Sequence, residues 1–143
     1  DVKAVKAYHK YYYSDDFSKE DLETVIKAIN DAAKTECVSM WDRDDSKSVT
    51  WVMHRSDLPD SKVGEFWFKN NVIFHYAPAY NHPDYSKAVL FHEIGHALGL
   101  AHMDHGVMKP GSQNERIAEG IAAMGQSLID SLKEQNIDIC KIN

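Results

Sequence analysis

The spacing of apolar residues at the start of the chain predicts a strand followed by a helix. Residues 3–13 are rich in aromatic and β-branched side chains, which is typical of a strand. Four apolar residues then recur at the helical period: Leu22, Val25, Ile26 and Ile29. They predict a first helix over about 19–34. Ser18, with Asp21 three residues later, is the expected N-terminal cap of that helix.

Four further strands are expected before a second helix. Residues 36–41 and 48–54 form two of them, around a charged loop. Residues 64–68 and 72–76 flank Lys69-Asn70-Asn71, which is typical of a β-hairpin. A stretch rich in Asn, Pro and Asp then leads to a segment whose apolar residues share one helical face: Leu90, Ile94, Ala97 and Leu98.

From about residue 114, apolar residues at helical spacing predict one long C-terminal helix. They are Ile117, Ile121, Met124, Leu128 and Leu132. Polar residues alternate with them, so this helix is amphipathic, and no apolar run in the chain approaches the roughly 20 residues of a membrane span. With 143 residues, of which 43% are apolar, the chain is long enough for one compact domain. Its net charge of −6 and the lack of a basic stripe argue against a nucleic-acid partner.

Residues 92–102 carry the candidate chemistry, with the sequence His-Glu-Ile-Gly-His-Ala-Leu-Gly-Leu-Ala-His. On a helix, His92 and His96 are four residues apart and lie on one face, so that both rings can reach one cation. Glu93 lies about 100° further round the helix, where it can hold a water but is poorly placed to be a ligand. This arrangement predicts a zinc site with Glu93 as general base.

Gly99 and His102 complete the expected zinc site. A glycine tolerates left-handed backbone angles, so Gly99 can end the helix and turn the chain until His102 becomes the third ligand. Three protein ligands leave the fourth position to water, as in catalytic zinc sites. The competing interpretation is a buried amphipathic helix with incidental histidines. Such a helix needs neither a Glu beside its first His nor a Gly and a His seven and ten residues after it.

The pattern HExxHxxGxxH, followed by Val107-Met108-Lys109-Pro110, resembles the metzincin clan of zinc endopeptidases. The Met-x-Pro form is most similar to matrixins and their small microbial relatives. In that clan, a Met-turn forms an apolar base under the three imidazoles, a role that the resemblance gives to Met108. Met103 directly follows the third ligand and leaves no room for a turn. Only the five residues 103–107 separate His102 from Met108, fewer than in typical matrixins.

The resemblance implies an α+β fold of the metzincin type. Such a fold has a twisted, mostly parallel five-stranded sheet with an antiparallel edge strand, an active-site helix, a Met-turn and a C-terminal helix. It would make 1–143 a single zinc metallopeptidase catalytic domain, with an upper part of about 1–99 and a lower part of about 100–143. Peptide substrate would pair with the antiparallel edge strand, which is the first arm of the hairpin. The substrate-binding residues expected there are Glu65, Phe66, Trp67 and Phe68.

Pro110, Gly111 and Ser112 occupy the place where matrixins build a wall of the pocket for the side chain after the scissile bond. Ser112 stands where the family has a Tyr two residues after this Pro. Astacin-like relatives instead carry a metal-binding Tyr two residues after the Met. Pro110 occupies that place, so no tyrosine ligand is expected.

Cys37 and Cys140 are the two cysteines of the chain, and we expect them to form one disulfide. A disulfide would indicate an extracellular, secreted protein. The alternative is two free buried thiols in a cytosolic protein. A bridge closing about 100 residues could contribute about 4–5 kcal/mol if its effect is the loss of chain entropy in the unfolded state.

Two weaker metal candidates remain. Residues 42–45, Asp-Arg-Asp-Asp, lack a recognisable calcium-ligand spacing, so a solvated turn is favoured. Residues 72–77 resemble the matrixin segment that carries a structural-zinc ligand, with His75 and His82 as the candidate ligands. The acidic loop that would supply the remaining ligands is not evident. We therefore expect one catalytic zinc, and neither calcium nor a second zinc.

These features predict a monomeric zinc endopeptidase that acts on peptide or protein substrates. A zinc-bound water would attack the peptide carbonyl, with Glu93 as general base and then as general acid toward the leaving amine. The alternatives are a zinc hydrolase of a non-peptide substrate and a catalytically silent module that binds a protein partner. The intact Glu93 argues against the silent module.

Overall fold

The computed structural model describes residues 3–5, 9–13, 19–40, 49–55, 64–67, 72–76 and 84–142. In chain order the elements are β1 (Lys3–Val5), β2 (His9–Tyr13), α1 (Lys19–Ala33), β3 (Val38–Met40), β4 (Val49–Arg55), β5 (Gly64–Trp67), β6 (Val72–Tyr76), α2 (Tyr85–Ala97), the 3-10 helix η1 (Gly106–Met108), α3 (Gln113–Ile117), α4 (Ile121–Glu134) and β7 (Ile137–Ile142). The expected α+β class is confirmed. Within the described ranges, no helix combines the length and the apolarity needed to cross a bilayer.

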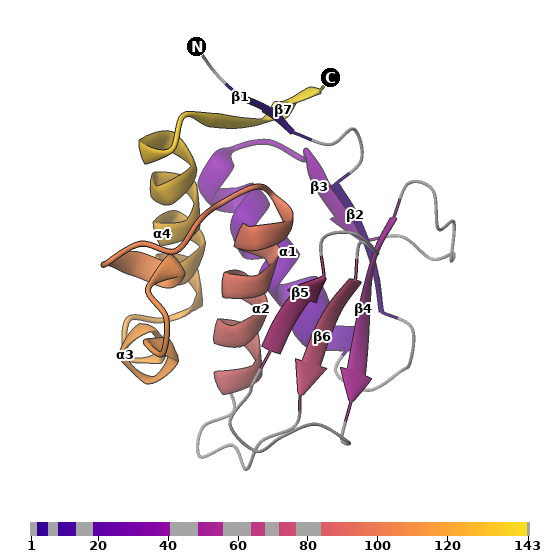
Figure 1. The fold of residues 1–143 in the computed structure, drawn as a ribbon, viewed down its shortest axis with the longest axis vertical. Helices are drawn as coiled ribbons and strands as arrows, with labels where there is room; N and C mark the ends of the chain where they lie inside the picture. The colour runs from indigo at the N-terminus through magenta and orange to yellow at the C-terminus, as the bar shows by residue number, and fades with distance from the viewer. Residues whose placement is uncertain are drawn as a thin grey trace.

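Five strands form the larger sheet, in the order β3-β2-β4-β6-β5. Strand β2 pairs in parallel with β3 and β4, and β4 pairs in parallel with β6. Strands β5 and β6 are the antiparallel arms of the expected hairpin, with Gly64 opposite His75 and Trp67 opposite Val72. Strand β5 therefore lies at one edge of the sheet, and α2 packs beside it (Figure 1).

The single strand expected over 3–13 is two strands in different sheets. Strand β1 pairs in parallel with β7, and Figure 1 shows this pair at the end of the molecule where both termini lie. Strand β7 is not among the elements expected from the sequence. Its signal is the alternation of buried Ile137 and Ile139 with exposed Asp138 and Cys140. A partner strand more than a hundred residues away cannot be inferred from the first residues alone.

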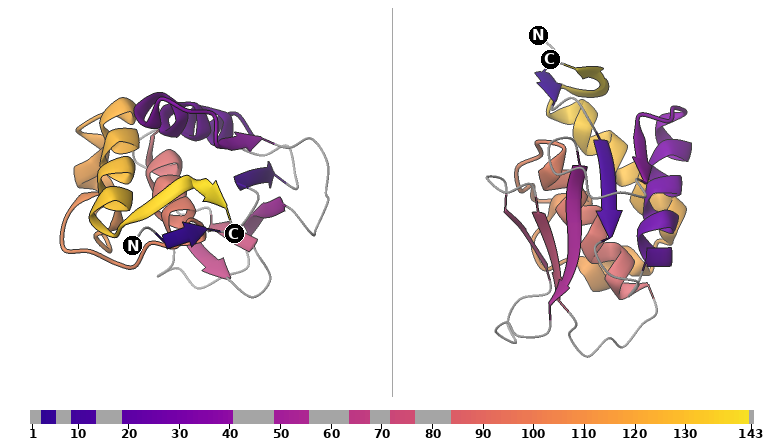
Figure 2. Two further views of the ribbon diagram at one scale, coloured as in Figure 1. Left: turned by 90° about the horizontal axis from the view of Figure 1, so that it is seen from above. Right: turned by 90° about the vertical axis from the view of Figure 1, so that its right-hand side faces the viewer.

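Helices α1 and α2 lie on one side of the larger sheet, as the right-hand view of Figure 2 shows. The predicted stripe of α1 is buried, from Leu22 to Ile29. Asp21, expected to take part in a cap, instead joins the two helices. Its carboxylate accepts a hydrogen bond from the Ser86 hydroxyl and lies 3.4 Å from the Lys87 ammonium. Ser18, the expected cap residue, lies outside the described residues.

The single C-terminal helix expected from about residue 114 is two helices, α3 and α4. They are separated at Gly120, which has a φ of 98°. A right-handed helix cannot continue through this left-handed backbone angle, which glycine adopts without steric cost. The apolar spacing from Ile117 to Ile121 runs through the break, which is why the pattern alone predicts one helix.

Helix α4 packs directly against α1. A Cβ at Gly125 would lie 2.7 Å from the carbonyl oxygen of Ala28, so only a glycine permits this approach. Met124 and Leu128 are fully buried in the same hydrophobic core as α1 and α2. Helix α4 is therefore a fixed element of the core, on which the neighbouring loops can be held.

A disulfide joins Cys37 and Cys140, as the sequence predicts. Their Cα atoms are 5.4 Å apart, although the residues are separated by 103 positions. The bridge ties the segment after α1 to β7. Because β7 also pairs with β1, the bridge links the two-stranded sheet to the helical core.

Reduction of this bridge is expected to lower the midpoint of thermal unfolding, because a cross-link spanning about 100 residues stabilises by about 4–5 kcal/mol in the chain-entropy treatment. Calorimetry with and without reductant measures the effect. The double variant Cys37→Ser/Cys140→Ser is the control, and reductant should leave its midpoint unchanged. Equal midpoints for the oxidised wild type and the double variant would contradict the prediction.

Candidate metal centre

Helix α2 presents His92 and His96 from one face, one turn apart. His92 is buried and His96 is half-buried, and their Nε2 atoms are 3.2 Å apart. Two nitrogens bound to one tetrahedral zinc at about 2.0–2.1 Å would lie about 3.3 Å apart. The spacing of the two rings therefore fits a single metal ion.

Backbone carbonyls fix the tautomer of both rings. The Nδ1 atom of His92 lies 2.8 Å from the carbonyl oxygen of Val107, and that of His96 lies 2.9 Å from the carbonyl oxygen of Leu100. A carbonyl only accepts, so each Nδ1 carries the proton and each Nε2 presents a lone pair. Burial lowers the pKa of His92 and lowers that of His96 to about 4, which keeps both rings neutral near pH 7. Two lone pairs this close repel each other unless a cation lies between them.

The turn at Gly99 supplies the third histidine. Gly99 has a φ of 104°. Its N–H donates a hydrogen bond to the carbonyl of His96, and the N–H of Leu100 donates one to the carbonyl of Gly95. These two hydrogen bonds form the Schellman pattern that ends a helix and reverses the chain. The turn returns His102 to α2, so that one ligand atom from each of the three histidines lies within 4.8 Å of the others. The three ring centroids are 4.7 to 5.2 Å apart.

The donor set suits zinc. Neutral imidazole nitrogens are common zinc ligands, and three of them with a solvent-facing side are typical of a catalytic site. His102 is exposed, which leaves that side open. The other histidines considered as ligands, His75 and His82, have side chains outside the described part of the structure, as does the loop 42–45.

Glu93 is buried between α2 and the start of β5, with 6% of its surface exposed. Gly64 lies directly against it, because a Cβ at Gly64 would be 3.2 Å from Oε2 of Glu93 and 2.6 Å from Cγ1 of Val89. Burial, and to a lesser degree the charge of Glu65, raises the pKa of Glu93 to about 8. A cation among the histidines would oppose this effect, because a nearby positive charge favours the carboxylate.

Met108 lies fully buried beneath α2, at the end of η1. Its side chain packs so closely on Gly95 that a Cβ at Gly95 would overlap Sδ of Met108. The Met108 carbonyl accepts a hydrogen bond of 3.0 Å from the N–H of Met103, so residues 103–108 form a closed loop. The glycine between the first two histidines is therefore what lets this methionine approach the helix.

The expected substrate-binding residues of the edge strand are placed in part. Glu65 and Phe66 lie on β5 and are half-buried, and Trp67 ends the strand. Phe68 lies outside the described residues. Gly64, the first residue of β5, lies against Glu93, so this strand begins beside the candidate site.

The three residues expected to form a pocket wall differ in exposure. Pro110 and Gly111 are exposed, whereas Ser112 is only 2% exposed. The Ser112 hydroxyl donates to the carbonyl of Lys109 at 2.7 Å. Ser112 therefore stabilises the turn after Met108, and its hydroxyl is not available to a ligand.

Residues 100–108, here called the ligand loop, are held by side chains at α4. The Ser127 Oγ accepts a hydrogen bond of 3.1 Å from the N–H of Val107. Oε1 of Gln135 accepts a hydrogen bond of 3.0 Å from the N–H of Ala101, and Nε2 of Gln135 donates one of 3.2 Å to the carbonyl of Ala101. The partners are separated by 20 and 34 positions, and no motif marks Ser127 or Gln135 in the sequence.

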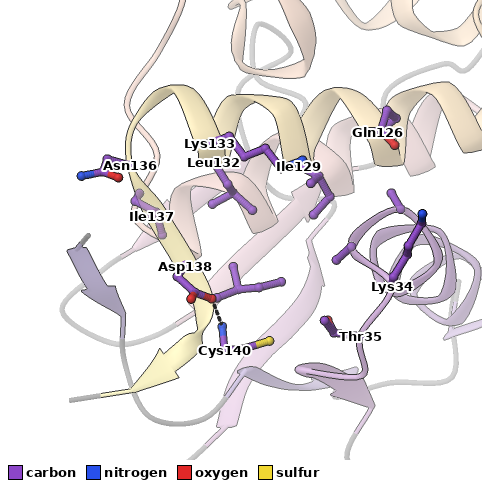
Figure 3. A pocket seen from close by; sticks show the side chains of 13 residues that line it. Lys34, Thr35, Gln126, Ile129, Leu132, Lys133, Asn136, Ile137, Asp138 and Cys140 are labelled. Carbon is purple, nitrogen blue, oxygen red and sulfur yellow. Dashed lines mark hydrogen bonds between the residues drawn. The ribbon is translucent and has the colours of Figure 1, made fainter. Parts of the chain in front are cut away.

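A cavity of about 600 Å³ lies apart from the histidines, between the end of α1, α4 and β7 (Figure 3). Its lining includes Lys34, Thr35, Leu132 and Ile139, and it lies beside Cys140 of the disulfide. It includes none of the three histidines and not Glu93. The candidate metal site and this cavity are therefore separate features of the molecule.

The model of the Astacin peptidase family matches the chain over residues 5–108. This range contains the three histidines, Glu93 and Met108, and it ends before α3, α4 and β7. No curated protein and no solved structure matches the chain.

The Gly95→Ala variant is expected to unfold at a lower temperature and to bind zinc less tightly than the wild type. Alanine favours an isolated helix by about 1 kcal/mol, but overpacking a core costs about 1–3 kcal/mol. Calorimetry and zinc titration measure the two effects. The substitution should cost less in a Met108→Ala background, where the overlapping side chain is absent. A gain in stability in both backgrounds would exclude this account of Gly95.

Proposed function

The chain belongs to the astacin family of peptidases and is a zinc metalloendopeptidase, and we propose that His92, His96 and His102 hold its single catalytic zinc. The observation that carries this assignment is the pair of Nε2 lone pairs, 3.2 Å apart, on rings whose Nδ1 protons are held by carbonyls. Hydrogen bonds of this kind orient zinc-binding histidines and increase their basicity.

The resemblance to matrixins is wrong at the level of the family, although astacins and matrixins share the metzincin clan. It rested on the Met-x-Pro form at Met108, whereas the astacin model matches residues 5–108. The three-residue form Met-x-Pro is weaker evidence for a family than a match over residues 5–108. Pro110 still stands where astacin-like relatives carry a metal-binding Tyr. We therefore propose that the three histidines are the complete set of protein ligands.

We propose that 1–143 is one catalytic domain in which the larger sheet is the metzincin sheet. The upper part, about 1–99, would contain this sheet with α1 and α2, and the lower part, about 100–143, would contain the ligand loop and α4. The antiparallel pairing of β5 with β6, at the edge next to α2, supports this correspondence. The burial of Met108 under Gly95 supports its role as the Met-turn base.

Glu93 is the proposed proton carrier. When bound, zinc supplies a Lewis acid that polarises the peptide carbonyl and lowers the pKa of a coordinated water to about 7. The Glu93 carboxylate accepts a proton from the nucleophilic water and delivers it to the leaving amine. Gly64 allows the carboxylate to lie against the start of β5, beside the edge along which a peptide would extend.

The proposed substrate is an extended peptide or protein segment that adds to β5 as a further strand. Its main chain would pair with residues 64–68, and the side chain after the cut would enter a pocket near residues 108–112. Because such pockets are lined mostly by apolar groups, we propose a medium or large hydrophobic residue there. The disulfide supports secretion, and a monomer is sufficient for this function.

The Glu93→Gln variant is expected to keep its fold and one zinc per chain, yet to lose about two to four orders of magnitude in peptide hydrolysis, the usual effect of removing a general base. Metal analysis and cleavage of a peptide library measure both properties. Glu23→Gln, at an exposed carboxylate of α1, is the control. Two zinc ions per chain would implicate His75 and His82. A wild type that binds peptides without cleaving any would favour a silent binding module.

Octapeptides are expected to be cleaved far better than dipeptides, because affinity from main-chain pairing grows with the paired length. Adjacent residues of a strand direct their N–H groups to opposite sides. Proline removes the N–H, so Glu65→Pro and Phe66→Pro should differ. The variant whose lost N–H points away from β6 should keep its zinc and its fold but lose turnover. The variant whose lost N–H points toward β6 should lose stability. Equal cleavage of dipeptides and octapeptides would contradict pairing along β5.

A further inference from the structure

Helix α4 and the residue that follows it make several contacts with the ligand loop, and two of them, from Ser127 and Gln135, involve residues next to or bonded to a zinc ligand. We propose that Gln135 and Ser127 are positioning residues that hold His102 and His92 in the geometry that binds zinc. This inference rests on the proposed zinc site but concerns residues beyond the range matched by the family model, which ends at Met108.

Gln135 fixes the residue before the third ligand. Its side-chain amide bonds to both the N–H and the carbonyl of Ala101, at 3.0 and 3.2 Å. This two-point contact resembles that of a neighbouring strand, and it fixes the backbone from which His102 extends. His102 is exposed and lies outside any helix or strand, so its position depends on such contacts.

Ser127 acts on the first ligand through one residue. Its hydroxyl oxygen accepts a hydrogen bond from the N–H of Val107. The carbonyl of Val107 in turn accepts a hydrogen bond from the Nδ1–H of His92. The approach is close, since a Cβ at Gly106 would lie 2.8 Å from Ser127 Oγ. Ser127 therefore sets the position of the carbonyl that selects the tautomer and the ring angle of His92.

Helix α4 is rigid enough to serve as the support. The contact of Gly125 with the Ala28 carbonyl and the burial of Leu128 and Leu132 hold it on α1. A third contact from α4, between Glu134 and Nε2 of His105 at 2.9 Å, is exposed on both sides. Exposed ion pairs contribute little, so the proposal excludes it.

The competing explanation is that both residues only stabilise the fold. Gln135→Met removes the two hydrogen bonds at similar volume, and Ser127→Ala removes one hydroxyl. The chain offers a matched control for each: Gln126→Met, at an exposed glutamine of α4 bonded to Asp130, and Ser39→Ala, at a half-buried serine of β3, because the other serine near Ser127, Ser131, also lies beside Gly106 of the ligand loop.

Competition with a chelator measures the zinc dissociation constant of each variant, and thermal unfolding of the metal-free proteins measures the fold. We expect Gln135→Met and Ser127→Ala to bind zinc about tenfold more weakly, the lower end of the range for residues that orient metal ligands. Metal-free unfolding midpoints should match those of the controls. Zinc affinities equal to those of the controls would overturn the proposal. A loss of zinc affinity together with a metal-free unfolding midpoint well below that of the matched control would overturn it too, because the residue would then only stabilise the fold.

A His102→Ala background separates the two routes. Because Gln135 acts through His102, Gln135→Met should have no further effect on zinc affinity there, whereas Ser127→Ala should still weaken binding through His92. An undiminished effect of Gln135→Met in that background would overturn its assigned route. A wild type without zinc would refute the proposed function itself. Tight binding by the wild type and by Gln135→Met alike would refute only this inference.

Discussion

Two backbone carbonyls that hold the Nδ1 protons of His92 and His96 are the constraint on which the candidate site depends. They belong to Val107 and Leu100, and each points a ring nitrogen of α2 toward a common centre. Both carbonyls lie in the chain after α2, so neither is in place until the turn at Gly99 has formed. The helix that carries the ligands and the loop that orients them are thus one structural unit.

The rest of the fold supports this unit from two sides. On one side, the larger sheet brings Gly64 of β5 against Val89 and Glu93, where a larger residue would clash with Val89 and crowd Glu93. On the other side, α4 packs on α1 at Gly125 and presents Ser127 and Gln135 to the ligand loop. In both places close packing fixes a polar group that would otherwise be free to move.

Local patterns and long-range pairing account for the differences between the expected and observed fold. Helix α1, the hairpin strands and α2 follow from apolar spacing and turn residues, because those signals lie within a few residues of one another. The break at Gly120 does not follow from apolar spacing, because it lies in a backbone angle. The separation of β1 from β2 does not follow either, because it depends on the pairing of β1 with β7. The match to astacins rather than matrixins likewise extends over most of the chain, whereas the resemblance to matrixins rested on the few residues after His102.

The sequence by itself determined the candidate ligands, since the spacing of His92, His96, Gly99 and His102 contains the geometry of one helix and one turn. It also determined that a disulfide within the chain could join only Cys37 and Cys140, because the chain has no other cysteines, whereas the structure shows that this bridge forms. Only the tertiary structure decided which groups orient those ligands. Ser127 and Gln135 reach the ligand loop from 20 and 34 positions away, and nothing near them in the sequence distinguishes them from other polar residues of a helix. Hydrogen bonds between distant segments exist only once the core has brought those segments together.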